Sequence, residues 1–299
     1  YKIWSIMNLS KLALVSVVSV SLLGCHAKKS TSSTENSNES NYEISLGEAE
    51  KVQMVREHYN PSERRVNDLL HTQLKVNFDW NNRQLHGEAA LTFQPYFYAT
   101  DSLTLDAKAM DIHSVMLNEN GEQKKVDYTY DGFFLRIKLP KEYRRSQQYQ
   151  IDIKYTANPE KVTQQGSSAI SDAKGLYFIN HDGSNPKQHQ EIWTQGETEA
   201  SSVWFPTIDS PNEKTTQEIY MTVQSKYQTL SNGLLIEAKD NGDGTRTDYW
   251  KMDLAHSPYL FMMAVGEYAI VKDSWTRKDG TTIDVDYYVE EKYAPHAKA

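Results

Sequence analysis

Residues 191–214 read EIWTQGETEASSVWFPTIDSPNEK. The stretch keeps neither a two-residue nor a 3.6-residue apolar period across its middle, which predicts a loop carried between strands. Two bulky aromatics, Trp204 and Phe205, and two prolines flank a small polar core, Gln195-Gly196-Glu197. Glycine has no Cβ, so another backbone can come close at this point. The stretch is therefore a candidate cradle for an extended ligand, and the simpler alternative is a solvated surface loop.

On both sides of this stretch the apolar residues recur with a period of two, which predicts half-buried strands. Asn120-Gly121 and Asp131-Gly132 are dipeptides typical of hairpin turns. Because the connections are short, we expect antiparallel pairing and an all-β sandwich. The alternating positions are Leu74, Val76, Phe78 and Trp80; Ala89, Leu91 and Phe93; Val126, Tyr128 and Tyr130; Leu135, Ile137 and Leu139; Tyr149, Ile151, Ile153 and Tyr155; Ile219, Met221 and Val223; and Ile283, Val285, Tyr287 and Val289, with further strands over 249–254 and 260–265.

The composition is that of a globular protein with an acidic surface. The chain has 299 residues, of which 38% are hydrophobic and 11% aromatic, enough to build a sizeable core. The formal net charge is -8, and lysine and arginine form no long run. Nucleic-acid partners are therefore not expected, because binding to phosphates requires clustered cations. An acidic surface also suits a secreted protein that is kept soluble by repulsion.

The amino terminus has the pattern of an export signal. Lys2 and Lys11 precede an apolar run over 12–23 that is short for a membrane span but suits the core of a signal peptide. The run ends in Leu-Leu-Gly-Cys at Cys25, which resembles the bacterial lipoprotein box. Cys25 is the only cysteine, so an intramolecular disulfide is excluded, and lipidation is the better explanation for a single thiol here. The alternative is a free thiol in a transmembrane anchor.

Five segments are predicted along the chain. Residues 1–24 form the lipoprotein signal peptide, and 25–44 form the lipidated cysteine and a flexible polar tether. A capping box and helical apolar spacing predict a short helix over 45–61. The β domain follows over 62–290. Residues 291–299, with a proline and helix-forming residues, are expected to be the truncated start of a second domain.

The opening stretch resembles the signature loop of the aminopeptidase N-like zinc metallopeptidases. The resemblance rests on Thr194-Gln195-Gly196-Glu197 together with Phe205-Pro206, Asp209 and Lys214, and on Gly266-Glu267-Tyr268 further along. It covers roughly residues 62–299 and implies the saddle-like N-terminal β domain of these enzymes. It also implies that Gln195, Gly196 and Glu197 line the pocket that holds the free amino terminus of a peptide substrate.

The catalytic motif of that family is missing from this sequence. Its zinc site uses H-E-x-x-H on a helix, and none of the nine histidines here is followed by glutamate. His181 and His189 lie eight apart around a proline, which is no ligand spacing, so we expect both in a loop. The resemblance implies zinc in the intact enzyme, and it implies that residues 291–299 are the truncated start of the catalytic domain. This chain is expected to contribute no metal ligand or catalytic residue and to be inactive alone.

Two functions follow from these observations. The first is the substrate-amine-binding domain of a cell-envelope zinc aminopeptidase that hydrolyses the first peptide bond and is anchored to a membrane, outer or periplasmic-facing, through Cys25. The second is a non-enzymatic surface lipoprotein that binds glycan or protein through Trp193, Trp204 and Phe205.

Cys25→Ser tests the lipid anchor. The substitution is expected to abolish incorporation of labelled fatty acid and to release the protein from membranes, since each buried methylene of an acyl chain contributes about 0.8 kcal/mol. Metabolic labelling and membrane sedimentation measure both effects. Unchanged labelling and pelleting would contradict the lipidation.

Overall fold

The structure is a computed structural model that describes residues 64–162 and 174–298. The chain divides into two units, 1–62 and 63–299, and the described residues belong to the second. The predictions for the signal peptide, for Cys25, for the tether and for the helix over 45–61 concern residues outside the described part. Within the described residues, no helix is long and apolar enough to cross a membrane.

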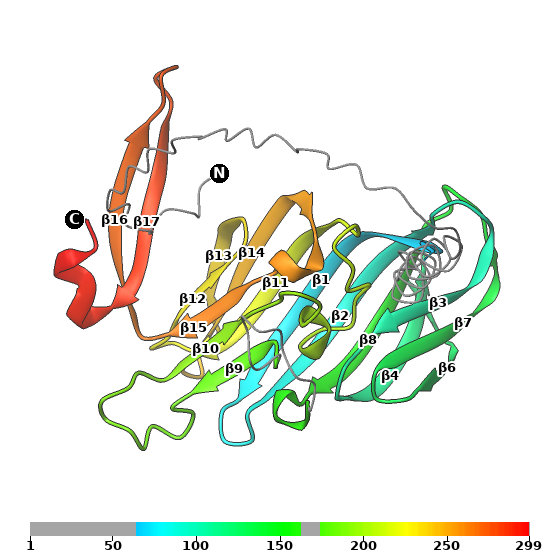
Figure 1. Cartoon of the computed structure of the whole chain (residues 1–299), viewed down its shortest axis with the longest axis horizontal. Helices are drawn as coiled ribbons and strands as arrows, with labels where there is room; N and C mark the ends of the chain where they lie inside the picture. Colours follow the sequence, from blue (N-terminus) through cyan, green and yellow to red (C-terminus); the bar gives the residue numbers. More distant parts are fainter. Residues whose placement is uncertain (1–63, 163–173, 299) are drawn as a thin grey trace, which may run out of the picture. The chain divides into compact units, whose positions relative to one another are not determined.

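The central element is an eight-stranded sheet. Figure 1 shows it extending from β13 and β14 through β1 and β2 to β8 and β4. Its strands, in spatial order, are β13 (Leu234–Asp240), β14 (Thr245–His256), β11 (Thr215–Gln224), β1 (Asn67–Asp79), β2 (Gln84–Pro95), β8 (Tyr149–Ala157), β4 (Met110–Glu119) and β5 (Glu122–Lys125). Residues 67–95 thus form the hairpin at the middle of the sheet, and later parts of the chain add strands on both sides.

One pair in this sheet is parallel. β1 and β11 pair in the same direction, from His71 beside Thr216 to Asn77 beside Thr222, whereas its other pairs are antiparallel. The two strands are separated by nine others in the sequence, so the chain has ample length for the crossover that a parallel pair needs. The antiparallel prediction therefore holds for the short connections on which it was based.

Three smaller sheets complete the fold. A three-stranded sheet contains β3 (Thr100–Asp106), β7 (Phe134–Tyr143) and β6 (Asp127–Tyr130). A four-stranded sheet orders β12 (Gln228–Ser231), β15 (Met263–Gly266), β10 (Glu191–Thr194) and β9 (Leu176–Ile179). The last is the hairpin of β16 (Tyr268–Thr276) and β17 (Thr282–Glu290). Short 3-10 helices are η1 (Pro159–Lys161), η2 (Ser201–Val203), η3 (Pro258–Leu260) and η4 (Glu291–His296).

The residues that alternate with a period of two in the sequence form the hydrophobic core, as predicted. In β2, Leu85, Gly87, Ala89, Leu91 and Phe93 are buried and their neighbours are more exposed. A strand places alternate side chains on opposite faces, so one face of the sheet collects the apolar residues. The all-β fold class is thereby confirmed.

Two boundaries differ from the prediction. Residues 191–194 were expected in a loop, but they form β10, because β9 and β15 pair with them on both sides. The strand expected from 260 starts only at Met263, since Pro258 begins η3. The first difference arises from pairing with segments far away in the sequence, which a local period does not report, whereas the second follows from the local turn that begins at Pro258.

Gly233 and Gly242 provide a matched test of the turns. Both adopt positive φ, +86° and +80°. A Cβ at Gly233 would lie 1.9 Å from the Lys251 carbonyl oxygen, whereas a Cβ at Gly242 would meet nothing within 4 Å. Gly242→Ala should lower the free energy of unfolding by about 1 kcal/mol through the left-handed conformation alone. Gly233→Ala should lower it by about 3 kcal/mol because of the added backbone clash. Urea denaturation measures both, and equal losses would contradict the close approach.

Candidate functional site

The candidate site begins where β10 ends. The Gln195 N–H donates to the Gly175 carbonyl at 3.0 Å, which continues the alignment of β9 and β10 by one residue. The Thr194 hydroxyl accepts from the Met263 N–H at 3.0 Å and so ties the strand end to β15. Gln195 is half-buried. The four-stranded sheet therefore determines the position from which the loop departs.

Gly196 is a point of close backbone approach, as predicted. A Cβ there would lie 2.3 Å from the Tyr259 carbonyl oxygen and 2.6 Å from Ser201 Oγ. Ser201 Oγ in turn donates to the Pro258 carbonyl at 2.8 Å. The neighbouring backbone belongs to η3 of the same chain. The glycine thus lets β10 and the segment after it pack against residues 257–261.

The loop turns immediately after Gly196. Ala200 N–H donates to the Gly196 carbonyl at 2.9 Å, and Glu197, Thr198 and Glu199 in between are exposed. Lys108 Nζ donates to the Glu199 carbonyl at 2.5 Å. Gln195, Glu197 and Glu199 would share one face only in an extended segment, and the turn after Gly196 ends that alternation. Glu197 and Glu199 instead belong to an exposed tip with fixed flanks.

The aromatic residues Trp204 and Phe205 of the loop belong to the hydrophobic core and do not form a ligand-binding surface. Trp204 and Phe205 are fully buried, their rings 4.4 Å apart, and Phe205 stacks on Phe261 at 5.2 Å. The Tyr155 hydroxyl donates to the Trp204 carbonyl at 3.0 Å. The prediction that Trp204 and Phe205 are exposed for a ligand is therefore wrong. Only Trp193 of the three proposed binding aromatics is exposed, and it stacks on Tyr177 at 4.6 Å.

A buried carboxylate secures the middle of the loop. Asp209 Oδ2 accepts from the Ser202 N–H at 2.9 Å, and the Asp209 N–H donates to Asp106 Oδ2 at 2.9 Å. Asp106 also exchanges backbone hydrogen bonds with Thr207, at 2.8 and 3.1 Å. Burial raises the pKa of the Asp209 carboxyl to about 6, and the hydrogen bonds from Ser202 only partly oppose this. The sequence motif includes Asp209, but nothing in it indicates this structural role.

A second buried carboxylate secures the end of the loop. Glu213 is fully buried and accepts from the Leu69 N–H and from Arg65 Nη2, both at 2.9 Å. Burial raises the pKa of Glu213 despite these donors. The position was not singled out by the sequence, because its partners Arg65 and Leu69 are distant in the chain. Glu213 attaches the loop to the start of β1.

His181 and His189 lie in the connection between β9 and β10, as predicted. His189 Nε2 is 3.3 Å from Glu290 Oε2. Across residues 64–162 and 174–298, no three His, Cys, Asp or Glu residues come together in a way that could hold a metal ion.

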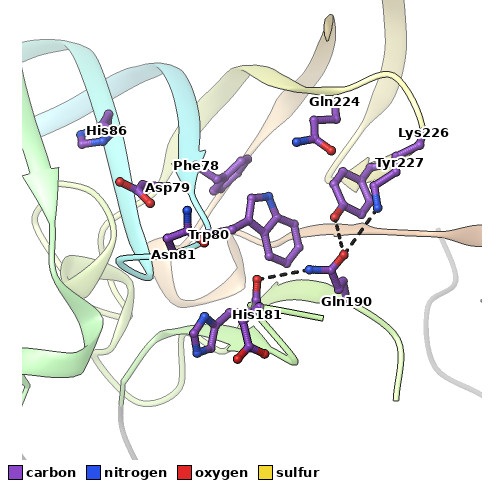
Figure 2. A pocket seen from close by; sticks show the side chains of 11 residues that line it. Phe78, Asp79, Trp80, Asn81, His86, His181, Gln190, Gln224, Lys226 and Tyr227 are labelled. Atoms are coloured by element: carbon purple, nitrogen blue, oxygen red, sulfur yellow. Dashed lines mark hydrogen bonds between the residues drawn. The ribbon is translucent and has the colours of Figure 1, made fainter. Parts of the chain in front are cut away.

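A pocket of 540 Å³ lies at the opposite end of β10 from Gln195. Figure 2 shows Trp80 in its centre, with Asp79, Asn81 and His86 on one side and Gln224, Lys226 and Tyr227 on the other. Trp80 stacks on Tyr227 at 5.0 Å. The Gln190 amide donates to the His181 carbonyl at 3.2 Å and accepts from the Tyr227 hydroxyl at 3.1 Å. These contacts hold the β9–β10 connection against the β11–β12 turn, so the pocket wall is occupied by structural interactions.

Residues 55–260 match the model of the Peptidase M1 N-terminal domain. The chain belongs to this family. Its M1 N-terminal fold is also found in solved structures of low identity, which support the fold alone. A two-domain M1 zinc metallopeptidase bound to L-arginine is 15% identical with a TM-score of 0.65, covering 78% of this chain and 50% of that one. The M1 zinc metallopeptidase of Deinococcus radiodurans is 16% identical with a TM-score of 0.62, covering 74% of this chain and 47% of that one.

A third similar structure is aminopeptidase A of Legionella pneumophila in complex with aspartic acid. It is 21% identical with a TM-score of 0.64, and the match covers 78% of this chain and 25% of that one. The M1 N-terminal domain described here therefore spans half or less of the length of these relatives. The described residues do not fit the zinc site that the family implies.

Asp209→Asn tests the buried carboxyl through pH. A pKa that is about 4 in the unfolded chain and about 6 in the fold means that the protonated form is favoured by folding. Its stability contribution is complete below about pH 4 and is lost as the pH rises through about 6. Asn cannot ionise, so the free energy of unfolding of Asp209→Asn relative to the parent should rise by about 2 kcal/mol between pH 4 and pH 7.

Urea denaturation at the two pH values measures this difference. Asp131→Asn is the control, because Arg136 and two backbone N–H groups lower the pKa of that exposed carboxyl to about 2. A lowered pKa favours the ionised form in the fold, so this variant should gain no stability over the same interval. If the free energies of unfolding of the parent and of Asp209→Asn change in parallel with pH, the pKa of Asp209 is not raised by burial.

Proposed function

We propose that this domain binds the free amino terminus of peptide substrates in an intact zinc aminopeptidase of the M1 family. Gln195, Gly196 and Glu197 form the wall of the site, and the zinc ligands come from outside this chain. The observation that carries the proposal is the exposed tip at Glu197, which projects from a loop whose two flanks are held by buried contacts. Membership of the M1 N-terminal family supports it.

The chemistry required of the tip is recognition of a cation. A peptide amino terminus has an ordinary pKa near 8 and arrives mostly as an ammonium at neutral pH, and a carboxylate beside it stabilises that form. Glu197 offers this charge, and Gln195, one residue before the turn, offers a neutral amide. A carboxylate at a fixed position determines which peptide bond is cleaved, because it places the substrate end at one distance from the reacting centre.

Gly196 and the anchoring contacts contribute precision. The close approach to the Tyr259 carbonyl and the hydrogen bond from Ala200 to Gly196 limit where the Glu197 backbone can lie. A binding group whose position is already determined loses less conformational entropy when the substrate binds. The tip is therefore suited to holding a ligand in one register.

The cell-envelope location is part of the proposal. An exported enzyme anchored through Cys25 would act on peptides outside the cytoplasm. The alternative of a glycan- or protein-binding lipoprotein loses support, because Trp204 and Phe205 are core residues and Trp193 alone remains exposed.

Glu197→Ala in the intact enzyme tests the proposed role. A hydrogen bond to a charged group contributes about 1.5 to 3 kcal/mol, so kcat/KM for aminoacyl amides should fall by roughly ten- to two-hundred-fold with unchanged zinc content. Gln195→Ala should cost less, because its contact is neutral. Steady-state kinetics and elemental analysis provide the measurements.

Glu199→Ala is the matched control, since Glu199 is an exposed carboxylate on the same tip and should affect kcat/KM little. If kcat/KM falls in Glu199→Ala and is unchanged in Glu197→Ala, the substrate amine is bound by Glu199 and not by Glu197. If neither substitution lowers kcat/KM, the tip does not contact the substrate.

A further inference from the structure

Three consecutive aromatic residues are exposed at the connection between β2 and β3. Tyr96 is 42% exposed, Phe97 58% and Tyr98 63%, and the neighbouring Val66 is 44% exposed. Three arginines lie over the rings: Arg64, Arg65 and Arg145. These seven residues are called the aromatic–arginine patch. Consecutive exposed aromatics of this size indicate an interaction surface.

The patch is held in one arrangement by contacts among its own members. The guanidinium carbons of Arg64, Arg65 and Arg145 lie 4.9, 4.1 and 5.7 Å from the ring centroids of Tyr98, Tyr96 and Phe97. Phe97 and Tyr98 meet edge to face at 4.8 Å. The Tyr96 N–H donates to the Val66 carbonyl at 2.9 Å, which ties the connection to the start of β1. The rings are therefore presented together on a fixed backbone.

The patch carries positive charge on an acidic protein. Arg65 is neutralised by Asp68 at 2.8 Å and by Glu213 at 2.9 Å, and through Glu213 it also links the patch to the end of the candidate loop. Arg64 and Arg145, in contrast, have no carboxylate partner among residues 64–162 and 174–298. The whole chain has a formal net charge of -8, so two such cations beside exposed aromatics are a local departure from the general surface. The complementary partner is anionic and has an apolar layer.

We propose that the aromatic–arginine patch binds the surface of an anionic phospholipid bilayer. Tyrosine rings are favoured at the boundary between headgroups and acyl chains, and Phe97 at the centre of the patch can enter the apolar layer. Arg64 and Arg145 meet the lipid phosphates, for which a guanidinium is well matched. The segment that leads back to Cys25 joins the domain at Arg64, within the patch. Binding of the patch to a bilayer is compatible with a lipid anchor at Cys25. It is a separate contact, which does not require lipidation.

Vesicle sedimentation tests the patch without any contribution from a signal peptide or a lipid anchor. The chain from residue 26 to 299 is mixed with vesicles of phosphatidylcholine containing about one third phosphatidylglycerol, and with vesicles of phosphatidylcholine alone. Binding is expected to the anionic vesicles, to fall on raising the salt concentration, and to be weak on the neutral ones. Arg64→Gln combined with Arg145→Gln should weaken binding by about thirtyfold, at about 1 kcal/mol for each arginine.

Phe97→Ser should weaken binding about tenfold through loss of the inserted ring. Phe133→Ser is the matched control, because Phe133 is 55% exposed and lies outside the patch, in the turn between β6 and β7. Circular dichroism checks that each variant is folded. Equal binding by Phe97→Ser and Phe133→Ser, no preference for anionic vesicles, or a patch that self-associates in solution without binding vesicles would each overturn the proposal.

Discussion

The burial of an irregular segment is the constraint on which the candidate site depends. Residues 200–209 are almost all buried, and from there the chain joins no sheet before β11 begins at Thr215. Buried backbone and side-chain polar groups must nevertheless find hydrogen-bond partners. Asp106 pairs with Thr207, Asp209 receives the Ser202 N–H, and Glu213 receives the Leu69 N–H. Asp106 in β3 and Leu69 in β1 hold the loop from two different parts of the fold, and the bond between Ser202 and Asp209 closes the loop on itself. These contacts fix the segment that follows the exposed tip at Glu197, and so they limit where the tip can lie.

Acidic residues in this loop therefore have two different roles that depend on burial. Asp209 and Glu213 are buried, their own pKa values are raised by desolvation, and their oxygens are used by internal donors. Removing an internal donor destabilises the protein, because the buried carboxylate is left without a hydrogen-bond partner and water cannot take the donor's place. Glu197 and Glu199 are exposed, so their carboxylates face solvent. Exposed carboxylates on a buried frame are the arrangement expected of a binding loop carried by a rigid scaffold.

The sequence by itself determined the features that depend on neighbours within a few residues. Alternating apolar positions in β2, such as Leu91 and Phe93, and turn glycines such as Gly121 and Gly132 follow from backbone geometry and local burial. The loop motif also predicts a close backbone approach at Gly196, because a residue without a Cβ leaves room for it. Such features need only the local sequence, since the chain that surrounds them changes neither the strand period nor the conformational freedom of glycine.

Only the tertiary structure decided the features that need distant partners. The parallel pairing of β1 with β11 and the conversion of residues 191–194 into a strand both require segments far apart in the sequence. Trp204 and Phe205 looked like ligand-binding aromatics in the sequence, but Tyr155 and Phe261 enclose them in the core. An aromatic side chain has the same local pattern whether it faces solvent or the interior, and the choice depends on which surfaces the remaining chain brings against it.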